Sequence, residues 1–282
     1  MASSLKQEGA DVTNFPLASI PATEVRLVHS AVAQQDYLIS IALPFHYAEH
    51  PEKVWPVIYL LDANLYFGLV VDMVRAMNIR VDFCNELPDA FIVGIGYPVT
   101  GSLAEMLHQV MHLRLRDFVR AREEGCEQFI QENFPLPDPI TSGNAGPFLQ
   151  FLQQELIPLI ESNYQADPSD RTLLGHSWGA DFTLYTLFQQ PRLFHRYVAA
   201  SPEPNFDDER GFAAHHDSLP VRLHLIVEDM KEQDIANLES FVNRLESRRY
   251  SDLTLTHQVI VDSTHCAVVP PAFQAGLVAV FS

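Results

Sequence analysis

Hydrophobic and polar residues alternate with a period of two near the start of the chain. Two such runs, 25–29 and 37–42, flank a polar break at 34–36. A period of two places successive side chains on opposite faces of a strand. The pattern therefore predicts an antiparallel hairpin over 25–44, at the edge of a sheet.

From residue 54 onward the pattern changes to short, nearly continuous apolar runs separated by helical stripes. Continuous apolar runs are typical of strands covered on both faces. Two such strands are predicted at 54–61 and 90–97, and further strands at 172–174, 197–200, 221–227 and 253–261. Helices are predicted at 65–77, 146–164 (kinked by Pro158), 235–248 and after Pro270. Strands that alternate with helices predict an α/β fold with a mostly parallel, doubly wound sheet.

The organisation predicted along the chain is one domain preceded by a short arm. Residues 1–22 are polar and are expected to form a flexible N-terminal arm, and 23–282 form the domain. The periodic pattern weakens over about 99–143, which contains a helix-like stretch at 103–122 and then a proline-rich stretch. We interpret this segment as a small cap-like insertion over the sheet edge.

Composition narrows the possible partners. The chain of 282 residues carries 36 acidic and 18 basic residues, a net charge of −18. Such a surface repels phosphate backbones and anionic lipids, so no nucleic-acid or membrane partner is expected. The three cysteines are widely spaced and have neither metal-ligand nor disulfide spacing, and residues 1–20 lack a signal-peptide pattern. No metal or other cofactor and a cytoplasmic location are expected.

The most informative motif is Gly-His-Ser-Trp-Gly, which stands between a predicted strand and a predicted helix in RTLLGHSWGADFTLYTLF. G-x-S-x-G in this context predicts a nucleophile elbow, with Ser177 at the apex of a strained turn. Gly175 and Gly179 lie where side chains would collide with the neighbouring strand or helix. The backbone N–H of Trp178 is expected to point toward a developing oxyanion.

A serine hydroxyl needs a base, and the base needs an acid that fixes its tautomer. In this fold the order along the chain is serine, then acid, then histidine. Of twelve histidines, His265 follows the elbow and stands in the loop after the last predicted strand. The acid is expected after the strand 221–227, where Asp229 is preferred over Glu228, with Asp234 as a third candidate.

The loop after the strand 54–61 is expected to supply a second oxyanion donor, a backbone N–H at Ala63 or Asn64. Because the donor is a backbone N–H, the side chains at these two positions do not show whether it is present.

Several segments resemble the esterase D-like family of α/β-hydrolases, which includes siderophore trilactone esterases and S-formylglutathione hydrolases. The most specific is SGNAGPFLQFLQQELIPLIESNYQADPSDRTLLGHSWG, and VWPVIYLLDANLYF, YVAASP and THCAVVPPAFQAGLVAVF are also similar. Departures include Ala63 and Ala180 where the family usually has glycine. The resemblance implies an α/β-hydrolase fold and Ser177 as the nucleophile. It also implies His265 as the base and the N–H groups of Asn64 and Trp178 as oxyanion donors.

These observations predict a serine carboxylic-ester hydrolase that acts on a small-molecule ester or lactone through an acyl-enzyme, without a cofactor. One alternative is acyl transfer by the same serine to an acceptor other than water. Another is a hydrolase-fold binding protein without catalytic activity.

Overall fold

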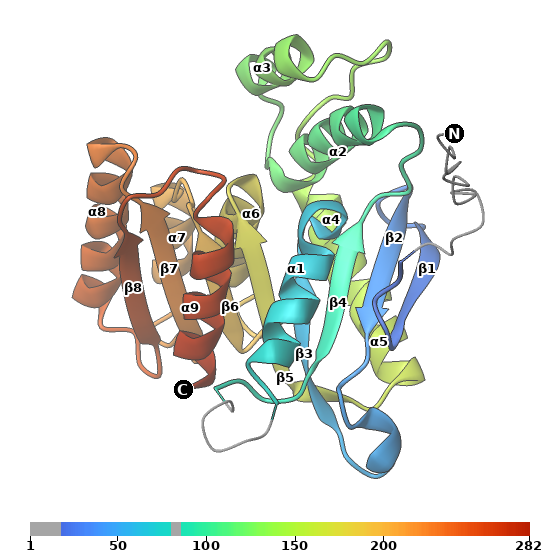
Figure 1. Ribbon diagram of the computed structural model, residues 1–282. Helices are drawn as coiled ribbons and strands as arrows, with labels where there is room; N and C mark the ends of the chain where they lie inside the picture. Colours follow the sequence, from blue (N-terminus) through green and yellow to red (C-terminus); the bar gives the residue numbers. More distant parts are fainter. Residues whose placement is uncertain (1–17, 80–85) are drawn as a thin grey trace, which may run out of the picture.

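A computed structural model describes residues 18–79 and 86–282. Most of the predicted arm, 1–17, lies outside these residues. The sheet has eight strands in the order β1-β2-β4-β3-β5-β6-β7-β8 (Figure 1). The strands are β1 (Thr23–Ser30), β2 (Gln35–Ala42), β3 (Trp55–Leu60), β4 (Phe91–Gly96), β5 (Ala166–His176), β6 (Arg196–Ala200), β7 (Arg222–Glu228) and β8 (Thr254–Ile260).

The pairing of the strands confirms the predicted architecture. β1 pairs antiparallel with β2, and β2 pairs antiparallel with β4. Every pairing from β4 through β3 and β5 to β8 is parallel. The hairpin predicted from the period-two pattern therefore forms one edge of a mostly parallel α/β sheet. The carboxyl ends of the parallel strands lie along a single edge of this sheet, where active sites of such folds form.

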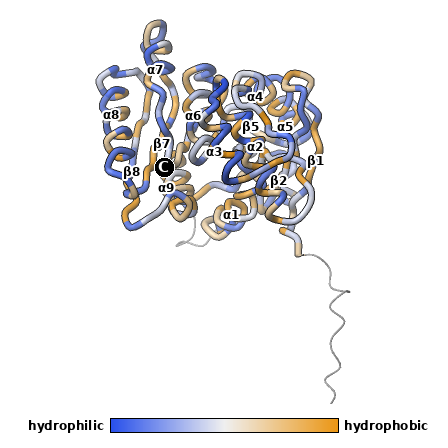
Figure 2. The backbone as a smooth tube through the Cα atoms, turned by 90° about the horizontal axis from the view of Figure 1, so that it is seen from above, coloured by the Kyte–Doolittle hydropathy of each residue, from blue (hydrophilic) through white to orange (hydrophobic). Residues whose placement is uncertain are grey.

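Helices cover both faces of the sheet (Figure 2). They are α1 (Ala63–Ala76), α2 (Leu103–Phe118), α3 (Glu124–Asn133), α4 (Ala145–Phe151), α5 (Ile157–Asn163), α6 (Trp178–Gln189), α7 (Phe206–Ala213), α8 (Glu232–Arg248) and α9 (Val269–Phe281). Successive strand residues contribute to opposite layers: Ile58 and Leu60 pack with α1 and α9, whereas Val57 and Tyr59 pack with α4, α5 and α6. The continuous apolar runs of the sequence reflect this double coverage.

The stretch predicted as one kinked helix is divided into three parts. A π-helical turn, η3 (Leu152–Leu156), separates α4 from α5. Pro158 stands in the first turn of α5, directly after this π-helical turn. The local change in helix pitch accommodates the proline, and the hydrophobic face continues through Leu149, Leu156 and Ile160.

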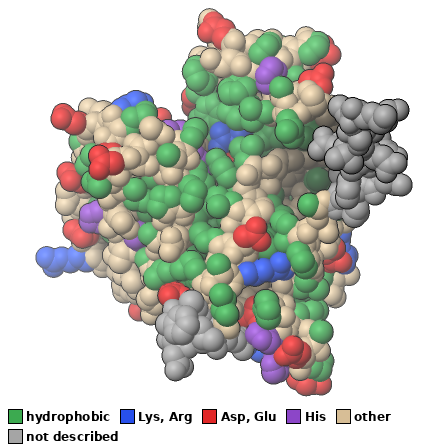
Figure 3. Space-filling model, in the orientation of Figure 1, with side chains coloured by type: hydrophobic (Ala, Val, Ile, Leu, Met, Phe, Trp, Pro, Cys, Tyr) green, Lys and Arg blue, Asp and Glu red, His purple; other side chains and the backbone are tan. Residues whose placement is uncertain are grey.

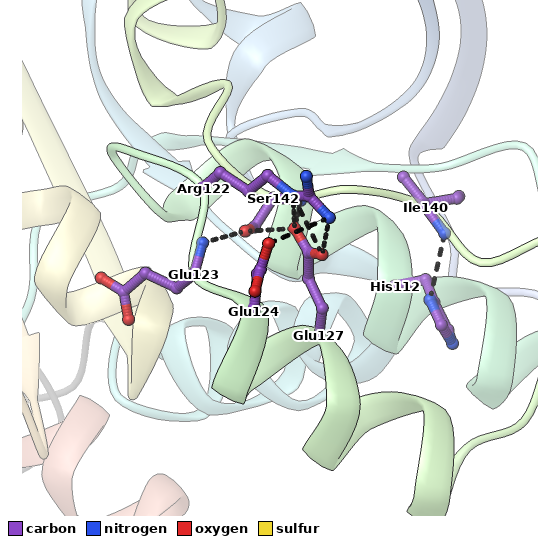
Figure 4. Close-up of polar contacts among 7 residues, drawn as sticks. All are labelled: His112, Arg122, Glu123, Glu124, Glu127, Ile140 and Ser142. Carbon is purple, nitrogen blue, oxygen red and sulfur yellow. Dashed lines mark hydrogen bonds and ion pairs between the residues drawn. The ribbon is translucent and has the colours of Figure 1, made fainter.

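The segment 99–143 contains two helices rather than the single one that was predicted. Figure 1 shows α2 and α3 beyond the end of the sheet toward which β4 points. Ser142 closes this segment: its Oγ accepts a hydrogen bond from the Glu123 N–H (2.8 Å), and both its N–H and Oγ–H donate to Glu127 (2.9 Å; Figure 4). Gly143 follows at φ 105°, and a side chain there would lie 2.8 Å from the backbone of Arg122.

Among the described residues, the structure has no helix long and apolar enough to cross a membrane.

Candidate active site

The turn between β5 and α6 has the geometry of a nucleophile elbow. Ser177 adopts φ 58° and ψ −128°, a strained combination for a residue with a side chain. A side chain on Gly175 would lie 2.3 Å from the carbonyl oxygen of Gly179, so only glycine allows the strand and helix to approach this closely. The Ser177 N–H donates to the Ala200 carbonyl of β6 at 2.9 Å. The hydroxyl-bearing residue is therefore fixed at the carboxyl end of the central strands.

The structure brings Glu228, and not Asp229, to His265. The two atoms Nδ1 of His265 and Oε1 of Glu228 are 2.8 Å apart. The other carboxylate oxygen of Glu228 accepts a hydrogen bond from the Ser201 hydroxyl. Glu228 is 1% exposed, and burial alone would favour its neutral form. The hydrogen bonds from Ser201 and His265 outweigh burial and hold the pKa of Glu228 below its usual value.

The preferred acid of the sequence prediction has a different place. The carboxylate of Asp229 accepts the backbone N–H groups of Asp262 (2.9 Å) and Ser263 (3.2 Å), which lower its pKa. It thereby holds the loop that leads to His265. The carboxylate of Asp234, the third candidate, lies 3.9 Å from the ammonium nitrogen of Lys231 and lines the same pocket as His265.

The N-terminus of α1 lies close to the elbow, since a side chain on Gly179 would be 3.2 Å from the Asp62 carboxylate. Trp178 is the first residue of α6 and Asn64 stands in the first turn of α1, where backbone N–H groups lack helical acceptors. The Asn64 side chain anchors its loop to β4, because it accepts from the Tyr97 N–H (2.7 Å) and donates to the Tyr97 carbonyl (3.0 Å). Asp62, two residues before Asn64, adopts a left-handed backbone conformation with φ 55°.

The sequence reasoning did not identify Arg114, which ties this loop to the elbow. Its guanidinium forms a two-pronged ion pair with Asp62 (2.8 and 2.9 Å) and donates to the His176 carbonyl (3.2 Å). The guanidinium also lies 5.3 Å from the ring centre of Trp178. Burial opposes the charge on Arg114, but the Asp62 carboxylate more than offsets it and raises the arginine pKa. A signal existed: Arg114 interrupts the apolar stripe that runs from Val110 to Phe118 on α2.

His176, inside the elbow motif, points away from the pocket and supports the backbone of His265. Its Nε2 lies 2.8 Å from the His265 carbonyl, so this nitrogen carries the proton, and Nδ1 accepts from the Tyr66 hydroxyl at 3.3 Å. Burial, with repulsion from His265 and Arg114, lowers the pKa of His176 to about 3. It is a neutral structural histidine.

The candidate site opens into a cavity of about 250 Å³. Its lining is mostly polar and includes Ser177, Trp178, Ser201, Glu228, Lys231 and His265. In the part of the chain that the structure describes, no group of three or more histidine, cysteine or carboxylate side chains is placed to hold a metal ion.

A mostly parallel sheet with a sharply turned serine after a central strand, and a histidine paired with a carboxylate at neighbouring strand ends, defines the α/β-hydrolase class. The chain belongs within it to the esterase family: the family model described as "Putative esterase" matches residues 30–258. The family resemblance seen in the sequence is thereby confirmed.

Individual relatives agree with this assignment. The ferri-bacillibactin esterase BesA of Bacillus subtilis is 34% identical over 201 residues, 70% of this chain and 65% of the relative. The siderophore triacetylfusarinine C esterase of Aspergillus fumigatus is 27% identical over 171 residues, 60% of this chain and 51% of the relative. The chain thus matches between half and two thirds of each relative's length. The crystal structure of the BES protein from Bacillus cereus superposes with a TM-score of 0.79 at 24% identity, covering 97% of this chain and 100% of that one, and shows the same fold.

Proposed function

We propose that the protein is a serine hydrolase that cleaves a carboxylic ester through an acyl-enzyme intermediate. The observation that carries the proposal is the pairing of His265 with buried Glu228 beside the strained Ser177, all three around one cavity. A carboxylate that accepts from Nδ1 leaves Nε2 of the imidazole available as the base. The catalytic acid in this proposal is Glu228, and Asp229 holds the histidine loop.

In the first half-reaction, Nε2 of His265 takes the proton of the Ser177 hydroxyl as its oxygen attacks the ester carbonyl. The negative charge that develops on the carbonyl oxygen is stabilised by the N–H groups of Asn64 and Trp178. Collapse of this intermediate breaks the ester bond, and His265 returns the proton to the leaving alcohol. Water then attacks the acyl-enzyme by the same route and releases the acid. The reaction needs no cofactor.

Two curated relatives are named for esters of siderophores, so small iron-chelating esters and lactones are the natural substrates to test first. This assignment rests on similarity over part of each relative. The reaction itself rests on the site.

Hydrolysis is tested with a p-nitrophenyl acyl ester and a fluorophosphonate probe. The wild-type protein is expected to turn over the ester and to be labelled at Ser177. Ser177→Ala should lose the label and lower kcat by about 10⁴-fold or more, leaving the residual that binding and the oxyanion donors provide. Full activity in Ser177→Ala would contradict the proposal. A labelled protein that releases acid only when an alcohol acceptor is absent would indicate acyl transfer instead.

A further inference from the structure

The strand next to the elbow also ends in a strained serine. Ser201 directly follows β6 and adopts φ 54°, a left-handed conformation that costs free energy in a residue with a side chain. Ser177 adopts φ 58° directly after β5, and β5 and β6 are adjacent parallel strands. Strained backbone persists where its surroundings determine it, and it clusters at functional sites. The strain at Ser201 therefore points to a role for its side chain.

The loop that begins at Ser201 is held at two points. The Ser201 N–H donates to the Ile226 carbonyl of β7 at 2.7 Å, two residues before Glu228. Two residues farther along the loop, the Glu203 N–H donates to the Asp181 side chain of α6 at 2.6 Å. These bonds fix the Ser201 side chain relative to the strand that carries Glu228.

The hydroxyl of Ser201 binds the carboxylate oxygen of Glu228 that His265 does not use. Nδ1 of His265 lies 2.8 Å from Oε1, and the Ser201 hydroxyl donates to Oε2. An ionised carboxylate can only accept hydrogen bonds, so the serine must be the donor. Burial acts to raise the pKa of Glu228, and the hydrogen bond from Ser201 is the largest of the effects that lower it. Without this hydroxyl, one oxygen of a buried carboxylate would lose its donor.

The imidazole that depends on this carboxylate lies at an open cavity. The His265 side chain is 42% exposed, whereas that of Glu228 is 1% exposed. Figure 3 shows the molecule hollowed between the part around α8 and the part formed by α2 and α3. Solvent on one side of the ring cannot fix its orientation, so the orientation depends on the buried carboxylate on the other side.

Other ionisable groups near Glu228 do not hydrogen-bond to its carboxylate in the part of the chain that the structure describes. His176 has its ring centre 4.7 Å from that of His265, and it is neutral because burial lowers its pKa to about 3. Asp229 accepts backbone N–H groups of the next loop. The ionisable residues that line the cavity together with Glu228 and His265 are Asp181, Glu203, Lys231 and Asp234.

We propose that Ser201 is a positioning residue of the hydrolase site, whose hydroxyl keeps Glu228 ionised and directed at Nδ1 of His265. This inference rests on the proposed function for its kinetic readout. A neutral Glu228 would no longer stabilise the imidazolium that forms during catalysis. The left-handed turn at Ser201 places the donor at the end of β6, beside the acid at the end of β7.

Ser201→Ala removes the hydroxyl and keeps the Cβ. The apparent pKa of the acidic limb of the kcat profile, which belongs to the Glu228–His265 pair, should rise by about one unit, because a hydrogen bond to a charged group is lost. For a p-nitrophenyl ester, kcat should therefore fall about tenfold at low pH and less at pH 8, with little change in KM. Ser162→Ala removes an exposed hydroxyl of α5 and is the matched control. An equal loss of kcat at every pH would indicate a purely structural role and contradict the proposal.

Ser201→Gly separates the hydroxyl from the backbone strain. Glycine adopts the left-handed conformation without a steric penalty, so this variant should resist urea at least as well as Ser201→Ala does. Its pH profile should nevertheless match that of Ser201→Ala. A wild-type pH profile in Ser201→Gly would assign the role to the backbone and overturn the proposal.

NMR tests the proposal without catalysis. Carbon-13 at the side-chain carboxyl of glutamate gives a Glu228 signal, which is assigned by its loss in Glu228→Gln. Between pH 8 and pH 5 this signal should stay near its ionised position in the wild type and move toward the neutral position in Ser201→Ala. That result supports the positioning role even if the wild type hydrolyses no ester. A Glu228 signal that moves no more in Ser201→Ala than in the wild type would refute the positioning role, and ester hydrolysis by the wild type would then still support the hydrolase assignment.

Discussion

Nδ1 of His265 lies 2.8 Å from Oε1 of Glu228, the last residue of β7. The glutamate is nearly inaccessible to solvent, and the hydroxyl of Ser201 binds its second oxygen. A buried carboxylate held in this way can orient the imidazole and stabilise its protonated form. The adjacent Asp229 is turned toward the backbone of the next loop.

We therefore predict that Glu228→Gln lowers kcat for a p-nitrophenyl ester by about 10³- to 10⁴-fold, since an amide in this position favours the wrong histidine tautomer. KM should change little, because Glu228 is expected to act through His265. Steady-state kinetics over a range of ester concentrations measures both quantities.

Asp229→Asn is the matched control, one residue along the chain. It keeps an acceptor for one of the two N–H groups, that of Asp262 or that of Ser263, and leaves the pair between Glu228 and His265 intact, so kcat should remain within about fivefold of the wild type. If Asp229→Asn were the more damaging of the two changes, the pairing with Glu228 would not be the catalytic one.

The choice between these two acids shows where sequence reasoning stopped. The places of Ser177 at the turn after β5 and of His265 in the loop after β8 could be predicted because each depends on local signals, a strand–turn–helix motif and a loop after the last strand. Their catalytic roles stay predictions. Which acid can reach His265 depends on the face of the sheet toward which each residue at the end of β7 points. Ile226 faces the layer that contains α9, and Glu228 has the same phase. Since His265 directly precedes α9, strand phase combined with the covering helix would have favoured Glu228.

The contacts of Arg114 could not be predicted because its partners are distant in the sequence, and the apolar stripe of α2 indicates only that this side chain is buried. It connects α2 with Asp62 after β3 and with the elbow after β5, contacts that only the assembled sheet creates. The buried strands at 54–61 and 90–97 were easier to predict, since each continuous apolar run reports burial on both faces by itself.

Removing the Arg114 guanidinium should be costly because Asp62 would remain buried and unpaired. We predict that Arg114→Met lowers the free energy of unfolding by about 3–5 kcal/mol, measured by urea denaturation. Arg210→Met breaks an exposed pair with Asp207 (3.1 Å) and should cost about 1 kcal/mol or less. Similar losses of unfolding free energy in the two variants would show that the buried pair between Arg114 and Asp62 stabilises the fold no more than an exposed pair does.

Arg114→Lys keeps the charge but loses the two-pronged geometry. We expect it to fold and to lower kcat about tenfold or more, because the loop that carries Asn64 is less firmly held. Kinetics of this variant tests the positioning role even if Arg114→Met does not fold.

His176 predicts how stability depends on pH. Its pKa is about 3 in the folded protein and about 6.5 in an unfolded chain, so the unfolded state binds the extra proton between these values. Stability from this residue is therefore complete above about pH 6.5 and is lost as the pH falls toward 3, by up to about 1.4 kcal/mol per pH unit.

Urea denaturation of the wild type and of His176→Gln, at pH 7 and at pH 4.5, measures this contribution. The glutamine variant should lose less stability between the two pH values than the wild type does. His215→Gln, at an exposed position, should match the wild type. If His176→Gln lost as much unfolding free energy between pH 7 and pH 4.5 as the wild type does, the effect could not be assigned to this buried ring.

Trp178 lines both the cavity beside Ser177 and a neighbouring cavity, and its ring centre lies 5.3 Å from the Arg114 guanidinium. We predict that the indole limits the acyl group, so that Trp178→Leu raises kcat/KM for p-nitrophenyl octanoate relative to the acetate by about tenfold. Trp178→Phe keeps a flat ring there and should preserve more of the original preference. Because the backbone N–H of residue 178 is retained in both variants, hydrolysis of the acetate should continue. An unchanged acyl profile in Trp178→Leu would mean that another wall of these cavities sets the limit.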